Sequence, residues 1–372
     1  MREALERPIT FEDFQDAINK RPGGKSPGPS GVTINMIKAL SPVACSQLYD
    51  ELSFLWTHRN HSSGRVNPQS WSHRWLCMVP KDKLGPASIQ RIRPISLYEV
   101  TRKLWTGVLN ERITQIWEET HILHPSQYGY QPHLGTESKI IQLLNVIGDA
   151  AETNKTFFLM AFDTKKAFDS VNKPLMLAAW IRLGIPEDID QYLMELDCEG
   201  RTTVKTQHAN AVYHQLGAQN VLSDHTDDDH AASFTARDGI GQGDLTSATA
   251  WIALYDILLC MMESNPITPY FSRRDQLNVD KCYTFAYADD LNTISPSLEH
   301  LQYTVDLVSA YNSITGFQFN EKLEFGTNQP RYSGNSVTVH DQDWNSFDIP
   351  IVHRLPIKIL GIPVDLSNGW KI

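Results

Sequence analysis

The chain has little of what marks secreted or membrane proteins. Its 372 residues include five cysteines, an odd number scattered along the sequence, which argues against a disulfide framework or a zinc knuckle. No apolar segment follows the first residues, as it would in a signal peptide. The longest strongly apolar segment, residues 251–262, contains Asp256 and is too short to cross a bilayer. These absences predict an intracellular protein with reduced thiols and no membrane partner.

The charge is unevenly distributed. A net charge of −10 for the whole chain argues against nucleic-acid binding. However, residues 1–120 carry 16 Lys/Arg and 12 Asp/Glu, whereas the remainder carries 17 and 31. Part of that acidity lies in residues 224–230, which we interpret as a solvated loop rather than a metal site. The composition, 41% hydrophobic and 20% charged, is typical of a globular protein with room for two or three subdomains.

Two adjacent carboxylates, Asp289 and Asp290, lie between segments of β-forming residues. Aromatic residues alternate before them and Leu291 follows, which predicts a β-hairpin with the acidic pair at its turn. Neighbouring carboxylates repel each other unless a cation lies between them. Taken alone, the pair is better explained as a solvated acidic turn.

A second element changes that interpretation. Residues 157–162 form an apolar run that ends at Asp163, which predicts a buried strand with a carboxylate at its end. Because Asp163 and Asp289 are 126 positions apart, only the tertiary fold can bring them together. A strand-end Asp with a hairpin Asp-Asp pair is the ligand set of a two-metal phosphoryl-transfer site.

Local patterns predict the other elements. Thr10 and Asp13 resemble a capping box before a helix, and Pro94 restricts the strand at 92–95 to a sheet edge. Gly184 and Gly316 are expected to end helices. We further predict a strand at 75–80 and helices at about 33–57 (interrupted near 41–42), 98–118, 135–152, 174–183, 187–196, 244–262 and 298–315.

An ordered series of motifs resembles the reverse transcriptase of non-LTR (LINE-type) retrotransposons. No single motif is specific, but the ordered set covers nearly the whole chain. The motifs occupy residues 25–31, 79–81, 91–97, 127–131, 163–169, 239–244, 287–290, 320–322 and 358–362. The resemblance implies an α+β fold with the fingers and palm of a right-hand polymerase, in which helices pack on one face of a small antiparallel palm sheet.

The resemblance also implies a division of the chain. We expect an N-terminal extension at 1–24, fingers at 25–155, a palm at 156–345 with an insertion at about 205–236, and a primer-grip region at 346–372. Since few residues follow the primer grip, the helical thumb is expected to be absent or truncated. No preceding endonuclease and no following RNase H are expected.

By the same resemblance the chain is an RNA-directed DNA polymerase. It transfers a nucleotide from a dNTP to the 3′-hydroxyl of a DNA primer on an RNA template, with two Mg²⁺ ions or, alternatively, Mn²⁺. Asp163 and Asp289 match the ligands that bridge the ions, and Asp290 a looser ligand. Asp169 is interpreted as the N-cap of the following helix.

Further residues match substrate and primer positions. Phe168 matches an aromatic residue beneath the sugar, where a ring excludes a 2′-hydroxyl; the alternative is a core Phe. Gln242 matches a residue that contacts the dNTP or the template base. Gly241 and the 245–247 segment depart from the family pattern, which predicts a less rigid turn. Triphosphate contacts are expected from Lys81 and Arg93 (or Arg91), a substrate contact from Lys322, and primer contacts from Tyr287, Leu360 and Gly361.

One other departure concerns Ser30, which replaces the usual Asp of the motif at 25–31 and is interpreted as structural.

Three alternative functions remain: an inactive or domesticated retroelement fragment that binds nucleic acid, a group II intron-type maturase, and an RNA-dependent RNA polymerase. The family's need to reach RNA and chromosomal DNA implies a location in the nucleus, the cytoplasm or both.

Overall fold

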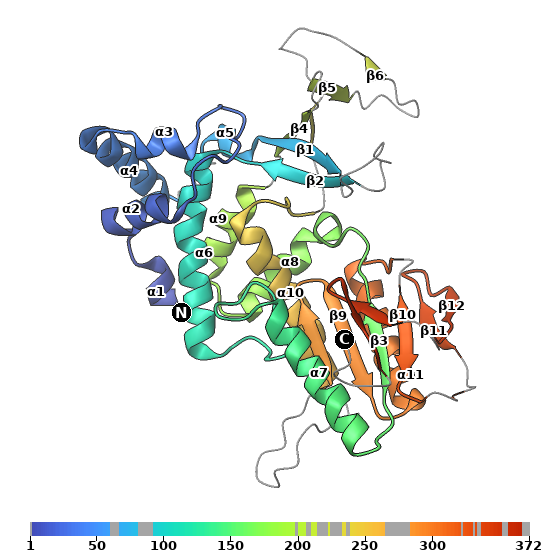
Figure 1. The fold of residues 1–372 in the computed structure, drawn as a ribbon. Coiled ribbons are helices and arrows are strands. Elements are labelled where there is room, and N and C mark those ends of the chain that lie inside the picture. Colours follow the sequence, from blue (N-terminus) through green and yellow to red (C-terminus); the bar gives the residue numbers. More distant parts are fainter. Residues whose placement is uncertain are drawn as a thin grey trace. The chain divides into compact units, whose positions relative to one another are not determined.

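The chain folds into two compact units, neither of which is one continuous stretch of sequence. The first contains residues 1–116 and 180–249, and the second contains residues 117–179 and 250–372. The computed structural model (Figure 1) describes residues 2–59, 67–80, 92–197, 200–205, 210–213, 222–223, 233–235, 239–264, 283–320, 323–329, 332, 336–351 and 356–366. The expected division into four sequential segments stays a prediction.

The first unit is largely helical, and the capping box predicted at Thr10 and Asp13 is present. Thr10 and Asp13 form the capping box of α2 (Phe11–Lys20). Ser41 caps α4 (Pro42–Thr57), which separates it from α3 (Ile34–Lys38). The other helices of this unit are α1 (Arg2–Glu6), α5 (Gln69–Ser72), most of α6 (Val100–Thr120) and α9 (Glu187–Glu195).

A mixed sheet belongs to the same unit. Its strand order is β2-β1-β4-β5-β6, with β7 also paired to β4. The strand that contains Pro94 lies at the edge, as predicted, and pairs antiparallel with its neighbour. The strands are β1 (Arg74–Pro80), β2 (Ile92–Leu97), β4 (Arg201–Lys205), β5 (Asn210–Tyr213), β6 (Leu222–Ser223) and β7 (Ser233–Thr235).

The second unit contains the predicted small antiparallel sheet, in the order β10-β3-β9-β8. These strands are β3 (Phe158–Phe162), β8 (Thr284–Tyr287), β9 (Asp290–Ser295) and β10 (Glu324–Thr327). Two hairpins accompany it: β11 (Val337–His340) with β12 (Ser346–Ile349), and β13 (Ile357–Ile359) with β14 (Ile362–Val364). Its helices are α7 (Thr136–Glu152), most of α8 (Lys173–Arg182), most of α10 (Leu245–Glu263) and α11 (Leu298–Thr315).

Helices cover both faces of this sheet, so the expectation of helices on one face is wrong. Residues that alternate along β3 and β9 are buried on either side, as Leu159 and Met160 show with 0% exposure each. On one face α7 packs in a core cluster with Leu159, Phe285 and Ile294. Helix α11 contacts β3 and β9. A sheet buried on both sides has no solvated face, which an antiparallel sheet covered by helices on one side would retain.

Helix α10 is the one helix in the described part of the chain that is long and apolar enough to cross a membrane by length and composition. The helix spans Leu245–Glu263, close to the predicted 244–262, and is therefore longer than the apolar segment 251–262 that was judged too short to cross a bilayer. Of its most apolar window, 72% is buried within the protein. Burial of this kind is what a core helix shows.

Candidate active site

The acidic pair lies at a hairpin turn, as predicted. Tyr287 in β8 pairs with Asp290 in β9, so Ala288 and Asp289 form a two-residue turn between them. Ala288 has a φ of +55°, whereas Asp289 has a negative φ. Positive φ at the first central residue alone is the pattern of a type II′ turn, which normally has glycine there. The turn is therefore strained at Ala288 and depends on surrounding contacts.

The sheet register brings Asp163 to the same place. Strand β3 pairs with β9 up to Phe162 opposite Leu291, and one further step in that register sets Asp163 opposite Asp290. Directly opposed residues of antiparallel strands have Cβ atoms about 4.5–5.5 Å apart. Two hydrogen bonds from Asn320 fix Asp163. The amide Nδ2 of Asn320 donates to Asp163 Oδ2 at 2.9 Å, and its main-chain N–H donates to the Asp163 carbonyl at 2.8 Å.

The three carboxylates influence one another. Burial, followed by the charges of Asp290 and Asp163, raises the pKa of Asp289 to about 6. Burial also raises the pKa of Asp290, against the effect of Lys139 and with that of Asp163. Among the residues that the structure describes, no three His, Cys, Asp or Glu side chains converge closely enough to hold a metal ion. The three carboxylates nevertheless repel one another, and each supplies oxygen donors of the kind that Mg²⁺ prefers.

A segment outside the sheet supports the acidic turn. The main chain of residues 126–128 forms a parallel bridge with Ala286, which includes a hydrogen bond from the Tyr128 N–H to the Ala286 carbonyl at 2.7 Å. The buried Gln127 Oε1 accepts hydrogen bonds from the N–H of Ala288, at 3.0 Å, and of Gly129, at 2.8 Å. A Cβ on Gly129 would lie 2.3 Å from the Ala288 nitrogen. The Gln-x-Gly motif thus positions the turn, a role that sequence reasoning missed.

The segment after Asp163 differs in part from the prediction. Residues Ala167–Ser170 form a short 3₁₀ helix that contains Asp169, and α8 begins only at Lys173. Asn172, not Asp169, supplies the cap, because its Oδ1 accepts from the Leu175 N–H at 3.1 Å. The N-cap interpretation of Asp169 is therefore wrong.

Phe168 lies in the same 3₁₀ helix and is half-buried. Its ring centroid is 5.7 Å from that of Trp251, at an interplanar angle of 31°. One side of the ring therefore has a core neighbour, while part of the residue reaches solvent. This position suits both of the interpretations made from the sequence.

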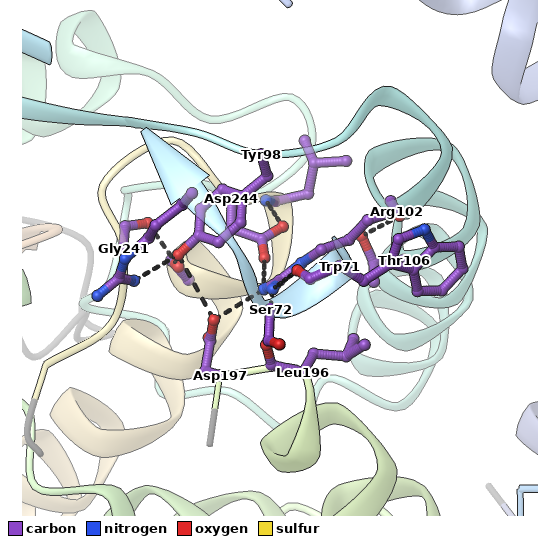
Figure 2. Close-up of polar contacts among 12 residues, drawn as sticks. Trp71, Ser72, Tyr98, Arg102, Thr106, Leu196, Asp197, Gly241 and Asp244 are labelled. Carbon is purple, nitrogen blue, oxygen red and sulfur yellow. Dashed lines mark hydrogen bonds and ion pairs between the residues drawn. The ribbon is translucent and has the colours of Figure 1, made fainter. Parts of the chain in front are cut away.

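Gln242 lies in the first unit, in a loop that a buried charge network holds (Figure 2). Its carbonyl accepts from the Ser96 N–H at 2.8 Å. Two residues further on, Asp244 forms an ion pair with Arg102, whose exposed fraction is 0%. Arg102 also bonds Asp197 at 2.9 Å and the carbonyls of Trp71 and Leu196. A buried arginine held by this many partners fixes the main chain around it.

The packing of the same loop bears on the prediction of a less rigid turn. A Cβ on Gly241 would lie 1.9 Å from Tyr98 Oη, and one on Gly243 would lie 2.5 Å from the Ser96 carbonyl oxygen. Gly243 requires glycine because the Ser96 main chain approaches closely and its φ is +125°, whereas a side chain at Gly241 would displace the buried Tyr98. The rigidity that the family obtains from proline is supplied here by packing and by the Arg102–Asp244 pair.

Of the predicted triphosphate residues, only Arg93 falls within the described chain. It lies exposed on edge strand β2, opposite Val79, in the first unit. Lys81, Arg91 and Lys322 lie outside the described residues, as does the acidic run at 224–230. Their roles stay predictions.

The predicted primer-binding residues all belong to the second unit. Tyr287 is half-buried at the end of β8. Leu360 and Gly361 form the two-residue turn of the β13–β14 hairpin and both have positive φ, +50° and +82°, which is the type I′ pattern. Leu360 packs against the core cluster that includes Phe285 and Ile357. This hairpin is thus anchored to the core that underlies the acidic turn.

Comparison with known proteins identifies the family. The family model described as "Reverse transcriptase (RNA-dependent DNA polymerase)" matches residues 79–364, which is most of the chain. The chain belongs to the reverse transcriptase family. Its relatives support the non-LTR branch. A Pol polyprotein from the type-1 retrotransposable element R2 of Popillia japonica is 27% identical over 318 residues, which are 85% of this chain and 39% of that protein.

Two further relatives of this reverse transcriptase are transposon proteins. A probable RNA-directed DNA polymerase from transposon BS of Drosophila melanogaster is 30% identical over 44% of this chain and 18% of its own length. An uncharacterized 149 kDa protein of transposon TX1 from Xenopus laevis is 20% identical over 86% of this chain and 22% of its own. The chain therefore spans less than half the length of each of these relatives.

Among solved structures, apo telomerase from Candida tropicalis, truncated from its C-terminal domain, aligns with 86% of this reverse transcriptase and 66% of its own chain. The alignment has 14% sequence identity and a TM-score of 0.46. The likeness is too weak to carry a conclusion.

Proposed function

We propose that this chain is the RNA-directed DNA polymerase of a non-LTR retrotransposon and extends a DNA primer on an RNA template. The observation that carries the proposal is the juxtaposition of Asp163 with the Asp289–Asp290 turn at one end of the second unit's sheet. Family membership supports the same reaction. We further propose that this sheet is the polymerase palm, that the first unit contains the fingers, and that the enzyme works in the nucleus, the cytoplasm or both.

The acidic cluster fits two Mg²⁺ ions in the chemistry of its donors. Bound cations would lower the pKa of the primer hydroxyl and neutralise the leaving pyrophosphate. Asp163 and Asp289 would hold both ions and Asp290 would bind more loosely. The protein's own part is to keep these carboxylates ionised and fixed: Asn320 orients Asp163, and Gln127 fixes the main chain beside Asp289. We propose triphosphate contacts by Lys81 and Arg93, a substrate contact by Lys322, and primer contacts by Tyr287, Leu360 and Gly361.

Primer extension on an RNA template tests the proposed function. The wild-type protein should extend a DNA primer with dNTPs and Mg²⁺, and a parallel reaction should use Mn²⁺. Asp289→Asn should reduce extension by at least about 10³-fold, because a neutral amide no longer balances the cations. Asp343→Asn is a matched control, since Asp343 is an exposed residue of the β11–β12 hairpin turn. Extension by Asp289→Asn at the control rate would sink the proposal, and duplex binding by a wild type that cannot extend would favour a non-catalytic protein.

We also propose that Phe168 excludes ribonucleotides. The half-buried ring rests against Trp251, so a nucleotide sugar would meet a ring that is supported from behind. Phe168→Ala should therefore raise the kcat/KM for rNTPs relative to dNTPs by about 10-fold or more, because the steric rejection of a 2′-hydroxyl is lost. Unchanged sugar preference in a folded, active Phe168→Ala protein would assign Phe168 to the core instead.

A further inference from the structure

A lysine side chain is buried directly beneath the acidic turn. Lys139 lies in the first turn of α7, on the helix face that also carries Leu143 and Ile147, and its exposed fraction is 0%. The rest of that face packs against the sheet in the apolar core cluster. Burying an ammonium group among apolar neighbours is strongly unfavourable unless it is compensated. A lysine at this position therefore requires a compensating contact.

The compensating contact is with the acidic turn itself. Lys139 Nζ donates to the main-chain carbonyl of Asp290 at 2.8 Å. Burial lowers the pKa of Lys139 to about 8, while the charges of Asp290 and Asp289 act in the opposite direction. The ammonium group acts on both carboxylates of the turn. In return it lowers the pKa of Asp289 and of Asp290, against burial and against the charge of Asp163.

The two main-chain contacts of the turn lie on either side of Asp289. Gln127 accepts from the N–H of Ala288, the residue before Asp289, and Lys139 donates to the carbonyl of Asp290, the residue after it. Both side chains that make these contacts come from one short stretch of sequence: Gln127 precedes α7, and Lys139 lies in its first turn. Of the two, only Lys139 carries a charge, and that charge is opposite to the charge of the carboxylates.

We propose that Lys139 is a positioning residue of the catalytic turn. It fixes the Asp290 main chain and offsets the mutual repulsion of Asp163, Asp289 and Asp290 when no cation is bound. The cluster then keeps a geometry that can take up divalent cations. This role rests on the proposed polymerase function, but its electrostatic part is measurable without any reaction.

A double-variant cycle on the metal-free protein tests that part. With EDTA present, Lys139→Met should lower the melting temperature by about 3–6 °C, because a hydrogen bond and a compensating charge are lost. In an Asp290→Asn background the same change should lower it by less than half as much, since one of the repelling charges is gone. Lys155→Met is the matched control, because Lys155 lies beyond the end of α7 with a half-exposed side chain.

Cation binding supplies the second measurement. Mn²⁺ should raise the melting temperature of Lys139→Met more than that of wild type, because the cation takes over the missing positive charge. In primer extension, Lys139→Met should lower kcat about 10-fold or more while the KM for dNTP changes less than about 3-fold, since positioning rather than substrate binding is lost. Lys139→Arg, which keeps the charge, should recover part of kcat.

The outcomes are separable. Equal destabilisation by Lys139→Met in both backgrounds, together with equal Mn²⁺-induced shifts, would show that Lys139 is only a packing residue. If Lys139→Met does not fold, the double variant decides: recovery of folding by Asp290→Asn supports the electrostatic role, and continued failure overturns it. A wild type that shows the electrostatic coupling but no extension would refute the proposed function and leave the coupling standing.

Discussion

The side-chain oxygen Oε1 of Gln127 accepts a hydrogen bond from the main-chain N–H of Ala288 at 3.0 Å, although the two residues are 161 positions apart. Ala288 has the positive φ that an alanine adopts only under constraint. The same oxygen accepts from the Gly129 N–H, so one buried amide links two main-chain segments. The position of Asp289 therefore depends on a residue that has no part in the chemistry.

Gln127→Ala should impair both stability and catalysis. The substitution leaves two buried N–H groups without their acceptor, which should lower the free energy of unfolding by about 1–3 kcal/mol. Because the turn is then free to relax at Ala288, kcat should fall about 10-fold or more while the dNTP KM changes little. Denaturant unfolding and steady-state extension measure the two effects. Gln142→Ala, at an exposed position of α7, should change neither, and wild-type kcat in Gln127→Ala would contradict the role given to the amide.

Gly241 should tolerate no side chain. Because a Cβ there would lie 1.9 Å from Tyr98 Oη, Gly241→Ala should lower the free energy of unfolding by about 1–3 kcal/mol through overpacking. Gly241→Pro, which restores the family's usual residue, should be at least as unfavourable. Gly23→Ala is the control, since the atom it would meet is the end of the Asn35 side chain, which can rotate away. A stable Gly241→Pro protein would show that the loop can move away from Tyr98.

Ser30 should not accept the family's aspartate. Its hydroxyl and its N–H both donate to the buried carboxylate of Glu99. Ser30→Asp would place a second carboxylate there, so the free energy of unfolding should fall by about 1–3 kcal/mol at pH 7. Glu99→Gln in the same chain should recover most of that loss because it removes the repulsion. If Ser30→Asp were equally unfavourable with and without the Glu99→Gln change, shape rather than charge would decide the residue at position 30.

The elements that the sequence predicted well depend on local chemistry. The capping box of α2, the interruption between α3 and α4 near residues 41–42 and the edge position of Pro94 each follow from groups a few residues apart. The acidic hairpin was predictable for the same reason. Asp169 shows the limit of local reasoning, because two good capping residues compete there and Asn172 caps α8.

The features that sequence reasoning missed depend on long-range packing. A Lys139 on a helix with apolar neighbours reads as a surface cation, and only its contact with Asp290, 151 positions away, shows otherwise. Alanine is not a typical residue at positive φ, so Ala288 gave no signal of its turn type. The two-sided cover of the sheet likewise follows from how α7 and α11 pack, which no strand pattern of this length determines.

Cation binding should weaken as the pH falls through about 6. The pKa of Asp289 is raised from 3.8 to about 6 in the folded protein by burial, Asp290 and Asp163. Ionising this group therefore disfavours the metal-free fold, an effect that is absent below about pH 4 and complete above about pH 6. Since a cation binds the ionised carboxylate, protons compete with it below the raised pKa.

The expected result is a loss of Mn²⁺ affinity that approaches about 10-fold per pH unit below about pH 6 and levels off above it, from the proton released at Asp289. Electron paramagnetic resonance of free Mn²⁺ between about pH 5 and 8 measures this without any nucleic acid. Asp289→Asn should bind Mn²⁺ more weakly and with a flatter pH dependence over about pH 5–6. If that variant kept the wild-type pH dependence, another group would set the titration, and Asp290, whose pKa is also raised, would be the first to examine.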